Sequence, residues 1–198
     1  LLPVAEPLLA DKPEHLFPRR PQDQMPADNR WGVRMAVPTL LYNRGELYNL
    51  AVERGTLSEE ERYKINEHIV QTLVMLSQLP FPKHLRKVPE IAGAHHEKMD
   101  GSGYPYKLRR EEMPPVARMM AIADIFEALT AIDRPYKKGK TLSEALAIMS
   151  RMQQEQHIDP ELFDLFLSSG VYDKYARKRM RPEQRDVDHE NLVIGKQR

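Results

Sequence analysis

Apolar residues become periodic after residue 56 of the chain. They recur at intervals of three or four, which is the spacing of one helical face: Ile65, Ile69, Leu73 and Leu76. Thr56 or Ser58 is suited to cap this helix, and residues 59–61 are glutamates, which favour the positive end of a helix dipole. The pattern predicts an amphipathic helix that ends before the proline-containing run at residues 79–84.

Further helices are predicted downstream from their start and stop signals. They begin after Pro89, at Pro114–Pro115, at Thr141 or Ser143, and at Asp159–Pro160. The second of these runs to about Ala131, the third to Met152, and the last ends near Gly170. Residues 97–113 are charged and rich in glycine and proline, which predicts a loop.

The first part of the chain has a different character. Seven prolines before residue 39 predict an extended linker or arm over residues 1–38, with a short extended piece that docks at Trp31–Val37. A helix is expected over Leu40–Arg54, capped by Gly55. Residues 39–178 are then the helical domain, and residues 179–198 a polar tail. No run alternates as strands do, so the fold is predicted to be all-α, a helical bundle with a proline-rich N-terminal arm.

Composition narrows the classes of function. The chain has 30 basic and 29 acidic residues, a balance that argues against nucleic-acid binding. It contains no cysteine, which excludes disulfides, thiolate metal sites and cysteine nucleophiles. No apolar run approaches the roughly 18 residues of a membrane span. The first residues form no signal peptide and include no initiator Met, so we expect a cytoplasmic piece of a longer protein.

Two adjacent histidines, His95 and His96, precede the sequence DGSGYP. Neighbouring helical side chains diverge by about 100 degrees, so the pair suits two different ions or a place where a helix ends. Imidazole nitrogens bind zinc, iron, manganese and copper. The alternative is one buried and one exposed histidine without a metal.

Two other residues are candidate co-ligands. His68 lies beside Ile69 at the edge of the apolar face, and Asp124 lies within the helix predicted from Pro114. The helical face of Asp124 is otherwise alanine, at positions 117, 121, 128 and 131. A buried carboxylate there needs a metal or a cation. The alternatives to a metal are an ion pair with Arg118 or Arg134, and a closely packed alanine face with Asp124 at its rim.

The segment after the histidines has the composition of a tight turn: Asp100, Gly101, Gly103, Tyr104 and Pro105. Asp100 can cap this loop from within, and Tyr104 can stack on a ligand base or cover the core. Further along the chain lies a cationic cluster: Arg134, Lys137, Lys138 and Lys140. Such cations near a metal suit phosphodiester hydrolysis, whereas alone they are equally typical of a solvated connection.

Residues 95–105, HHEKMDGSGYP, followed by residues 114–138, PPVARMMAIADIFEALTAIDRPYKK, resemble the HD-GYP domain of the HD phosphohydrolase superfamily. Members of that family are all-α and carry two or three metal ions. Many hydrolyse the bacterial second messenger cyclic di-GMP, and some accept related cyclic dinucleotides. The resemblance covers about Gly55 to Leu167 and implies a metal-dependent phosphodiesterase of bacterial signal transduction.

The resemblance also implies roles for particular residues. The implied metal ligands are His68, His95, His96 and Asp124. Arg134 with Lys137 or Lys138 would contact substrate phosphate. The metals would be divalent, with iron or manganese ahead of zinc or nickel. The implied partners are a cyclic dinucleotide, the HD-containing and sensor or receiver segments of the same protein, and GGDEF-type proteins.

The chain departs from the family pattern in three places. No His–Asp dyad occurs in its 198 residues, Glu127 stands where many members have Asp, and KLRREEM lacks a glycine that often follows the GYP loop. With part of the ligand set, the chain is expected to hold at most one metal weakly and to be nearly inactive alone, as the C-terminal fragment of a cyclic di-GMP phosphodiesterase. The alternatives are a degenerate, non-catalytic HD-GYP module that mediates signalling interactions, and another HD-type hydrolase that acts on nucleotides.

Overall fold

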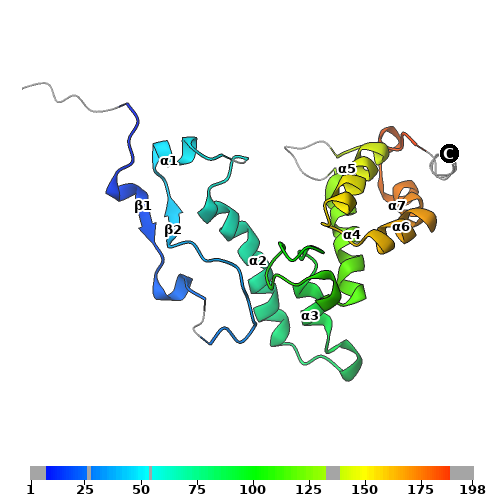
Figure 1. Cartoon of the computed structure of the whole chain (residues 1–198), viewed down its shortest axis with the longest axis horizontal. Helices are drawn as coiled ribbons and strands as arrows, with labels where there is room; N and C mark the ends of the chain where they lie inside the picture. Colours follow the sequence, from blue (N-terminus) through cyan, green and yellow to red (C-terminus); the bar gives the residue numbers. More distant parts are fainter. Residues whose placement is uncertain (1–7, 26–27, 54, 133–138, 188–198) are drawn as a thin grey trace, which may run out of the picture. The chain divides into compact units, whose positions relative to one another are not determined.

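The computed structural model describes residues 8–25, 28–53, 55–132 and 139–187 (Figure 1). Contacts divide the chain into two compact units, Leu1–Pro80 and Phe81–Arg198. The described residues are predominantly helical and include one sheet, of two strands, so the all-α prediction is confirmed in its main feature. None of the described helices is long and apolar enough to cross a bilayer.

The first unit contains β1 (Leu16–Pro18), β2 (Leu40–Asn43), α1 (Glu46–Leu50) and α2 (Glu59–Ser77). β1 and β2 are antiparallel, with Leu16 opposite Asn43, and α2 packs against β2. The prediction of a helix over Leu40–Arg54 is therefore wrong, because the first four residues pair with β1 and the helix ends at Leu50. This pairing joins segments more than twenty residues apart, which local periodicity does not reveal.

The proline-rich segment before β2 docks on α2 instead of extending freely. Arg19 donates from Nε to the Pro38 carbonyl at 2.9 Å and lies 4.6 Å from the centre of the Tyr63 ring. Trp31 donates from Nε1 to Ser77 Oγ at 3.3 Å. The piece around Trp31 thus docks as predicted, although it forms no strand among the described residues.

The helix α2 begins as its sequence predicts. Ser58 and Glu61 form a capping box, in which the Ser58 amide donates to Glu61 Oε2 at 2.9 Å and the Glu61 amide donates to Ser58 Oγ at 3.3 Å. Ile69 and Leu73 are buried, as the apolar periodicity requires, but Ile65 remains 54% exposed. The buried face of α2 therefore also includes Tyr63 and Val70 and leaves out Ile65, so it is rotated about the helix axis from the predicted stripe.

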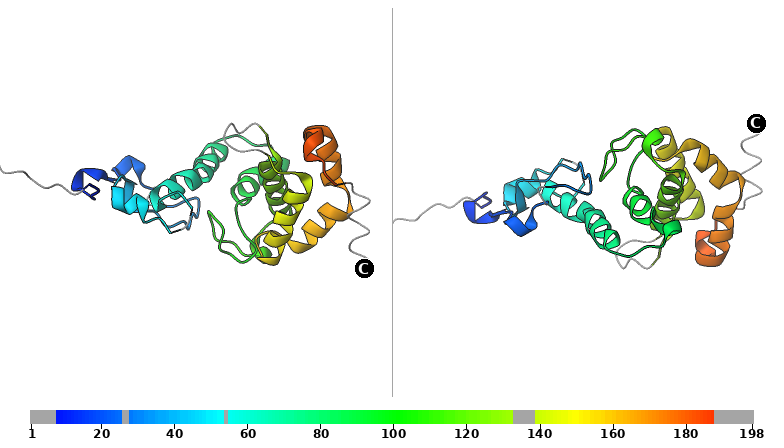
Figure 2. Two further views of the ribbon diagram at one scale, coloured as in Figure 1. Left: turned by 90° about the horizontal axis from the view of Figure 1, so that it is seen from above. Right: turned by 90° about the horizontal axis from the view of Figure 1, so that it is seen from below.

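The second unit holds the remaining helices: α3 (Val88–Gly93), α4 (Pro115–Thr130), α5 (Leu142–Gln154), α6 (Pro160–Ser168) and α7 (Val171–Arg179). α4 contacts α3, α5 and α6, and α6 also contacts α5 and α7. Figure 2 shows this group from two further sides. Its core is built from apolar side chains of four helices and one connection: Ile122, Phe126, Leu142, Leu146, Met149, Ile158, Phe163 and Tyr172.

The helix starts predicted at Pro115, Thr141 and Asp159 are confirmed, and Gly170 stops α6 with φ +65. Packing continues beyond α7. Gln184, in the 3-10 turn Pro182–Gln184, is buried and donates from Nε2 to the carbonyls of Thr130 and Lys140, each at 2.9 Å. This side chain therefore joins the end of α4 to the start of α5.

Candidate metal centre and GYP loop

The adjacent histidines lie just beyond a helix end. α3 ends at Gly93 and Ala94 is its C-cap, so His95 and His96 stand where the backbone leaves the helix. Both are half-buried, and their ring centroids are 4.0 Å apart with planes inclined at 43°. This geometry matches one of the two arrangements that the sequence analysis allowed for a vicinal pair, and it brings both imidazoles to one place.

The orientation of the His95 ring is fixed by the backbone. Its Nδ1 lies 2.6 Å from the carbonyl oxygen of Ala92. A carbonyl oxygen only accepts hydrogen bonds, so we assign the ring hydrogen to Nδ1 and the lone pair to Nε2. Metal-binding histidines use this arrangement, in which one nitrogen donates to a carbonyl and the other is the ligand atom.

His68 repeats the same local geometry. It lies on α2, where its Nδ1 is 2.6 Å from the carbonyl oxygen of Ile65, one turn earlier. The same reasoning assigns its lone pair to Nε2. His68 belongs to the first unit and the vicinal pair to the second. Their joint binding of one ion stays a prediction.

Within the second unit, Tyr104 lies against His96. The Tyr104 ring is stacked on His96, with centroids 4.9 Å apart and planes at 19°, and its amide donates to the His96 carbonyl at 3.3 Å. Burial and then the negative charge of Asp124 raise the pKa of Tyr104. Tyr104 thus stacks on a histidine ring of the chain, an arrangement different from both roles expected for it, and stacking on a ligand base stays a prediction.

Asp124 itself differs from the expectation of a buried carboxylate, because its side chain is exposed. The core of the second unit covers the face of α4 that carries Ile122 and Phe126, which leaves Asp124 towards solvent. Arg118, one of the cations considered as its partner, bonds to Asp159 instead. Exposure keeps Asp124 accessible to an ion.

The loop after the histidines is organised by Glu97, a residue to which the sequence analysis gave no role. Its carboxylate is buried and accepts hydrogen bonds from the Tyr106 amide at 2.5 Å and the Leu108 amide at 2.9 Å. Burial and then the Glu97 charge raise the pKa of Tyr106 to about 12. The available signal was an acidic residue that directly follows two histidines and precedes a turn-rich loop.

The loop's own residues complete its shape. Asp100 accepts from the Ser102 amide at 2.8 Å, which lowers the pKa of Asp100 and makes it the internal cap that was one of its predicted uses. Gly101 adopts φ +82. At Gly103 a Cβ would lie 2.4 Å from the Lys98 nitrogen, so only glycine fits there.

A buried ion-pair network ties the end of this loop to α6. Asp159 accepts from Arg110 Nε at 2.9 Å and from Arg118, and it caps α6 through the Glu161 and Leu162 amides at 3.0 and 3.1 Å. Burial alone would raise the pKa of Asp159, but the hydrogen bonds from Arg110, Leu162 and Arg118 lower it to about 2.

The predicted phosphate contacts Arg134, Lys137 and Lys138 lie outside the described residues. Lys140, the fourth member of that cluster, is described, and its Nζ is 3.8 Å from Glu144 Oε1. The described part of the site therefore comprises His95, His96, Tyr104, Asp124 and the loop held by Glu97 in the second unit, and His68 in the first.

Comparison with known families decides what this constellation represents. Residues 3–162 match the model of the family described as HD domain, and the residues 95–105 carry the HD-GYP motif. The chain belongs to the HD-GYP branch of the HD domain family. The match includes the proline-rich segment before β2 as well as His68, His95, His96 and Asp124.

Several curated HD-GYP relatives resemble the chain. A 3'3'-cGAMP-specific phosphodiesterase 3 of Vibrio cholerae is 38% identical over 143 residues, which are 69% of this chain and 29% of the relative. A cyclic di-GMP phosphodiesterase of Pseudomonas aeruginosa is 33% identical over 148 residues, 74% of this chain and 32% of the relative. A probable cyclic di-GMP phosphodiesterase of Vibrio cholerae is 46% identical over 129 residues, which are 60% of this chain and 28% of the relative. The chain thus spans about a third of the length of these relatives.

Proposed function

We propose that this chain is part of a metal-dependent phosphodiesterase that hydrolyses a guanine-containing cyclic dinucleotide, cyclic di-GMP or 3'3'-cGAMP. The observation that carries the proposal is the pair His95 and His96, with the Nδ1 of His95 held by a backbone carbonyl and the Tyr104 ring stacked on His96. The names of the HD-GYP relatives supply the substrate class.

The donor set fits a divalent transition metal. Neutral imidazoles with their lone pairs on Nε2, together with an exposed carboxylate, suit iron, manganese, zinc and nickel. In this proposal the ligands are His68, His95, His96 and Asp124, and iron or manganese is the expected ion. A bound metal of this kind supplies an activated water and neutralises charge at the phosphorus.

The chain's other residues position the site and the substrate. Glu97 fixes the loop that carries Tyr104, so the tyrosine ring stays against His96 and limits the freedom of that imidazole. Arg134 with Lys137 or Lys138 is assigned to the substrate phosphates, where guanidinium and ammonium groups stabilise the charge that develops during hydrolysis.

Activity of the chain by itself is expected to be weak or absent. Its 198 residues contain no His–Asp dyad, and a centre of two metal ions would need ligands beyond the four assigned here. The dyad would come from an HD-containing segment of the same protein. The second candidate, favoured by the same missing dyad, is a non-catalytic module that binds signalling partners.

The test combines elemental analysis with hydrolysis assays. The purified chain is assayed for cyclic di-GMP and 3'3'-cGAMP hydrolysis alone and with an equimolar segment that carries a His–Asp dyad. We expect at most one metal per chain and little turnover alone, with turnover restored in the mixture. A folded, metal-loaded complex without turnover would favour the non-catalytic module, and two tightly held metals on the chain alone would contradict the partial ligand set.

A further inference from the structure

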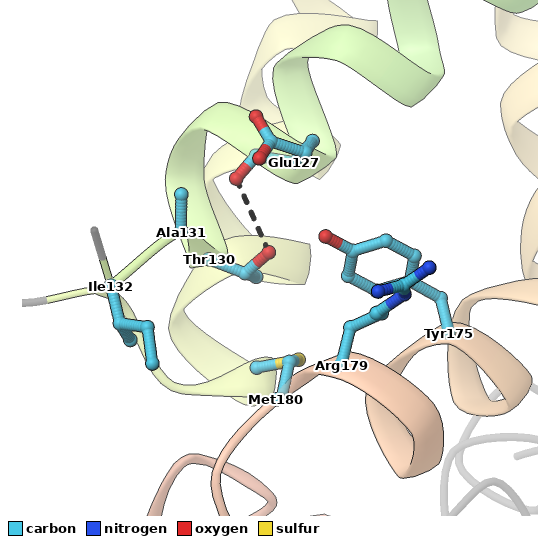
Figure 3. A pocket seen from close by; sticks show the side chains of 7 residues that line it. All are labelled: Glu127, Thr130, Ala131, Ile132, Tyr175, Arg179 and Met180. Carbon is cyan, nitrogen blue, oxygen red and sulfur yellow. Dashed lines mark hydrogen bonds between the residues drawn. The ribbon is translucent and has the colours of Figure 1, made fainter. Parts of the chain in front are cut away.

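A cavity of about 300 Å³ opens in the second unit, between the end of α4 and the end of α7. Its lining combines polar and apolar side chains: Glu127, Thr130, Ala131, Ile132, Tyr175, Arg179 and Met180 (Figure 3). We call this cavity the base pocket. Its volume lies at the lower end of the range of small-molecule sites, which accommodates a single ring system better than an extended ligand.

The base pocket lies next to the candidate metal ligand on α4. Glu127 follows Asp124 by three residues, so the two carboxylates share one face of the helix and are separated by about 4.5 Å along its axis. Both side chains are exposed. A substrate whose phosphate meets a metal ion bound by Asp124 would therefore have its neighbouring sugar and base directed along α4, either towards the base pocket or away from it.

The polar groups of the base pocket are available to a ligand. Neither Glu127 nor Arg179 forms an ion pair within 4 Å with another described residue, although they carry opposite charges and line the same cavity. Thr130 is satisfied within α4, since its hydroxyl donates to the Phe126 carbonyl at 2.8 Å. The pocket thus offers one carboxylate acceptor and one guanidinium donor group.

An aromatic wall completes the pocket. The Tyr175 ring is half-buried and is held edge-on by Phe126, with centroids 5.5 Å apart. In Figure 3 its hydroxyl points towards the side of Thr130 and Glu127, and Ile132 lies on the opposite side of the pocket. A fixed aromatic ring beside apolar side chains is a surface on which a nucleobase stacks.

We propose that the base pocket binds a guanine base of the cyclic dinucleotide, an assignment that rests on the proposed function. Guanine presents two N–H donors, N1–H and N2–H₂, on one edge and two acceptors, O6 and N7, on the other. A carboxylate accepts from the first edge and an arginine fork donates to the second, so Glu127 and Arg179 match both. Adenine has no N1–H to donate to the Glu127 carboxylate. It carries an amino donor where guanine has O6, so it cannot accept there from Arg179.

The test uses the 198-residue chain and measures binding by isothermal titration calorimetry. The probes are guanosine 5'-monophosphate, adenosine 5'-monophosphate and, with added manganese, cyclic di-GMP. We expect a preference for the guanine mononucleotide, and we expect Glu127→Gln to weaken its binding on the order of 10-fold to 100-fold and to remove the preference. Arg179→Gln is expected to weaken it similarly.

Matched controls remove a side-chain charge of the same sign outside the base pocket. Glu111→Gln alters an exposed glutamate before α4, and Lys178→Gln alters the exposed neighbour of Arg179 on α7. Both are expected to bind all probes within about 2-fold of the unaltered chain. Circular dichroism verifies that each variant is folded.

The outcomes separate this proposal from the proposed function. Cyclic di-GMP binding that is unchanged in Glu127→Gln and Arg179→Gln, or no binding of the guanine mononucleotide at millimolar concentration, would overturn the base pocket and leave the phosphodiesterase assignment standing. Guanine-selective, Glu127-dependent binding of the mononucleotide without any binding of cyclic di-GMP would support the pocket and contradict the proposed substrate.

Discussion

A single buried carboxylate, Asp159, bonds to several polar groups of the second unit. The apolar periodicity of the sequence does not indicate this role. Asp159 caps α6 and neutralises two arginines, Arg110 from the end of the GYP loop and Arg118 from α4. The start of α6 and two arginines more than forty residues before it therefore depend on one side chain. A buried charge of this kind is costly when one partner is removed, because the remaining charges keep their desolvation penalty.

Asp159→Asn should destabilise the chain by about 3 kcal/mol at pH 7. The amide retains a weak N-cap but leaves Arg110 and Arg118 without a counter-charge. Urea denaturation monitored by circular dichroism measures the loss. Asp173→Asn is the control, since Asp173 pairs with Arg177 on the surface of α7 and such pairs contribute under about 1 kcal/mol. Equal effects of the two substitutions would show that the Asp159 network contributes no more than a surface pair.

Asp159 also makes the free energy of unfolding depend on pH in the acid range. The pKa of Asp159 in the folded chain is about 2, below the ordinary 3.8, so its stabilising effect is complete above about pH 4 and is lost as the pH falls towards 2. The shift corresponds to about 2 kcal/mol. The stability difference between the chain and Asp159→Asn should therefore narrow from pH 5 to pH 2. A constant difference over that interval would contradict the lowered pKa.

At the scale of elements, the GYP loop has little freedom to vary. Gly103→Ala would place its Cβ 2.4 Å from the Lys98 nitrogen and 2.5 Å from the Glu97 Cα. Both are backbone atoms, so the clash can be relieved only if the backbone of Glu97 and Lys98 shifts. We expect the loop to lose its hydrogen bonds to Glu97, with a loss of about 2 kcal/mol in stability and weaker binding of manganese. Thermal denaturation and a manganese titration measure both effects.

The control for this substitution lies in the same loop. Lys107 has φ +54, a conformation that glycine adopts without strain, so Lys107→Gly should change the stability by less than about 1 kcal/mol. A Gly103→Ala variant as stable as Lys107→Gly, with unchanged manganese affinity, would show that the loop tolerates a side chain at position 103.

Elements with local signals were predictable from the sequence, and those made by distant contacts were not. Proline at N1 and Thr141 or Asp159 at the N-cap determine where α4, α5 and α6 begin. The strand Leu40–Asn43 exists because β1 pairs with it, and α7 was missed because its sequence is dominated by charge. At the site, the motif identified the histidines, whereas the buried bonds of Glu97 required coordinates.

At the scale of the whole molecule, the proposed metal site draws ligands from both compact units. His68 comes from the unit that ends at Pro80, and His95, His96 and Asp124 come from the unit that follows. Each histidine with a carbonyl-bound Nδ1 is prepared locally, by its own backbone turn. Binding of one ion by these ligands stays a proposal, and such an ion would be lost when the ligand from either unit is removed.

A shared ion makes a specific prediction about stoichiometry. His68→Ala, His95→Ala and the double variant should all lose the same ion, so elemental analysis after dialysis against limiting manganese should give nearly the same low metal content for all three. His84→Ala, which alters an exposed histidine outside the proposed ligand set, should retain the metal content of the unaltered chain. If His68→Ala kept its metal while His95→Ala lost it, the two histidines would not serve one ion, and the ligand set would have to be confined to the second unit.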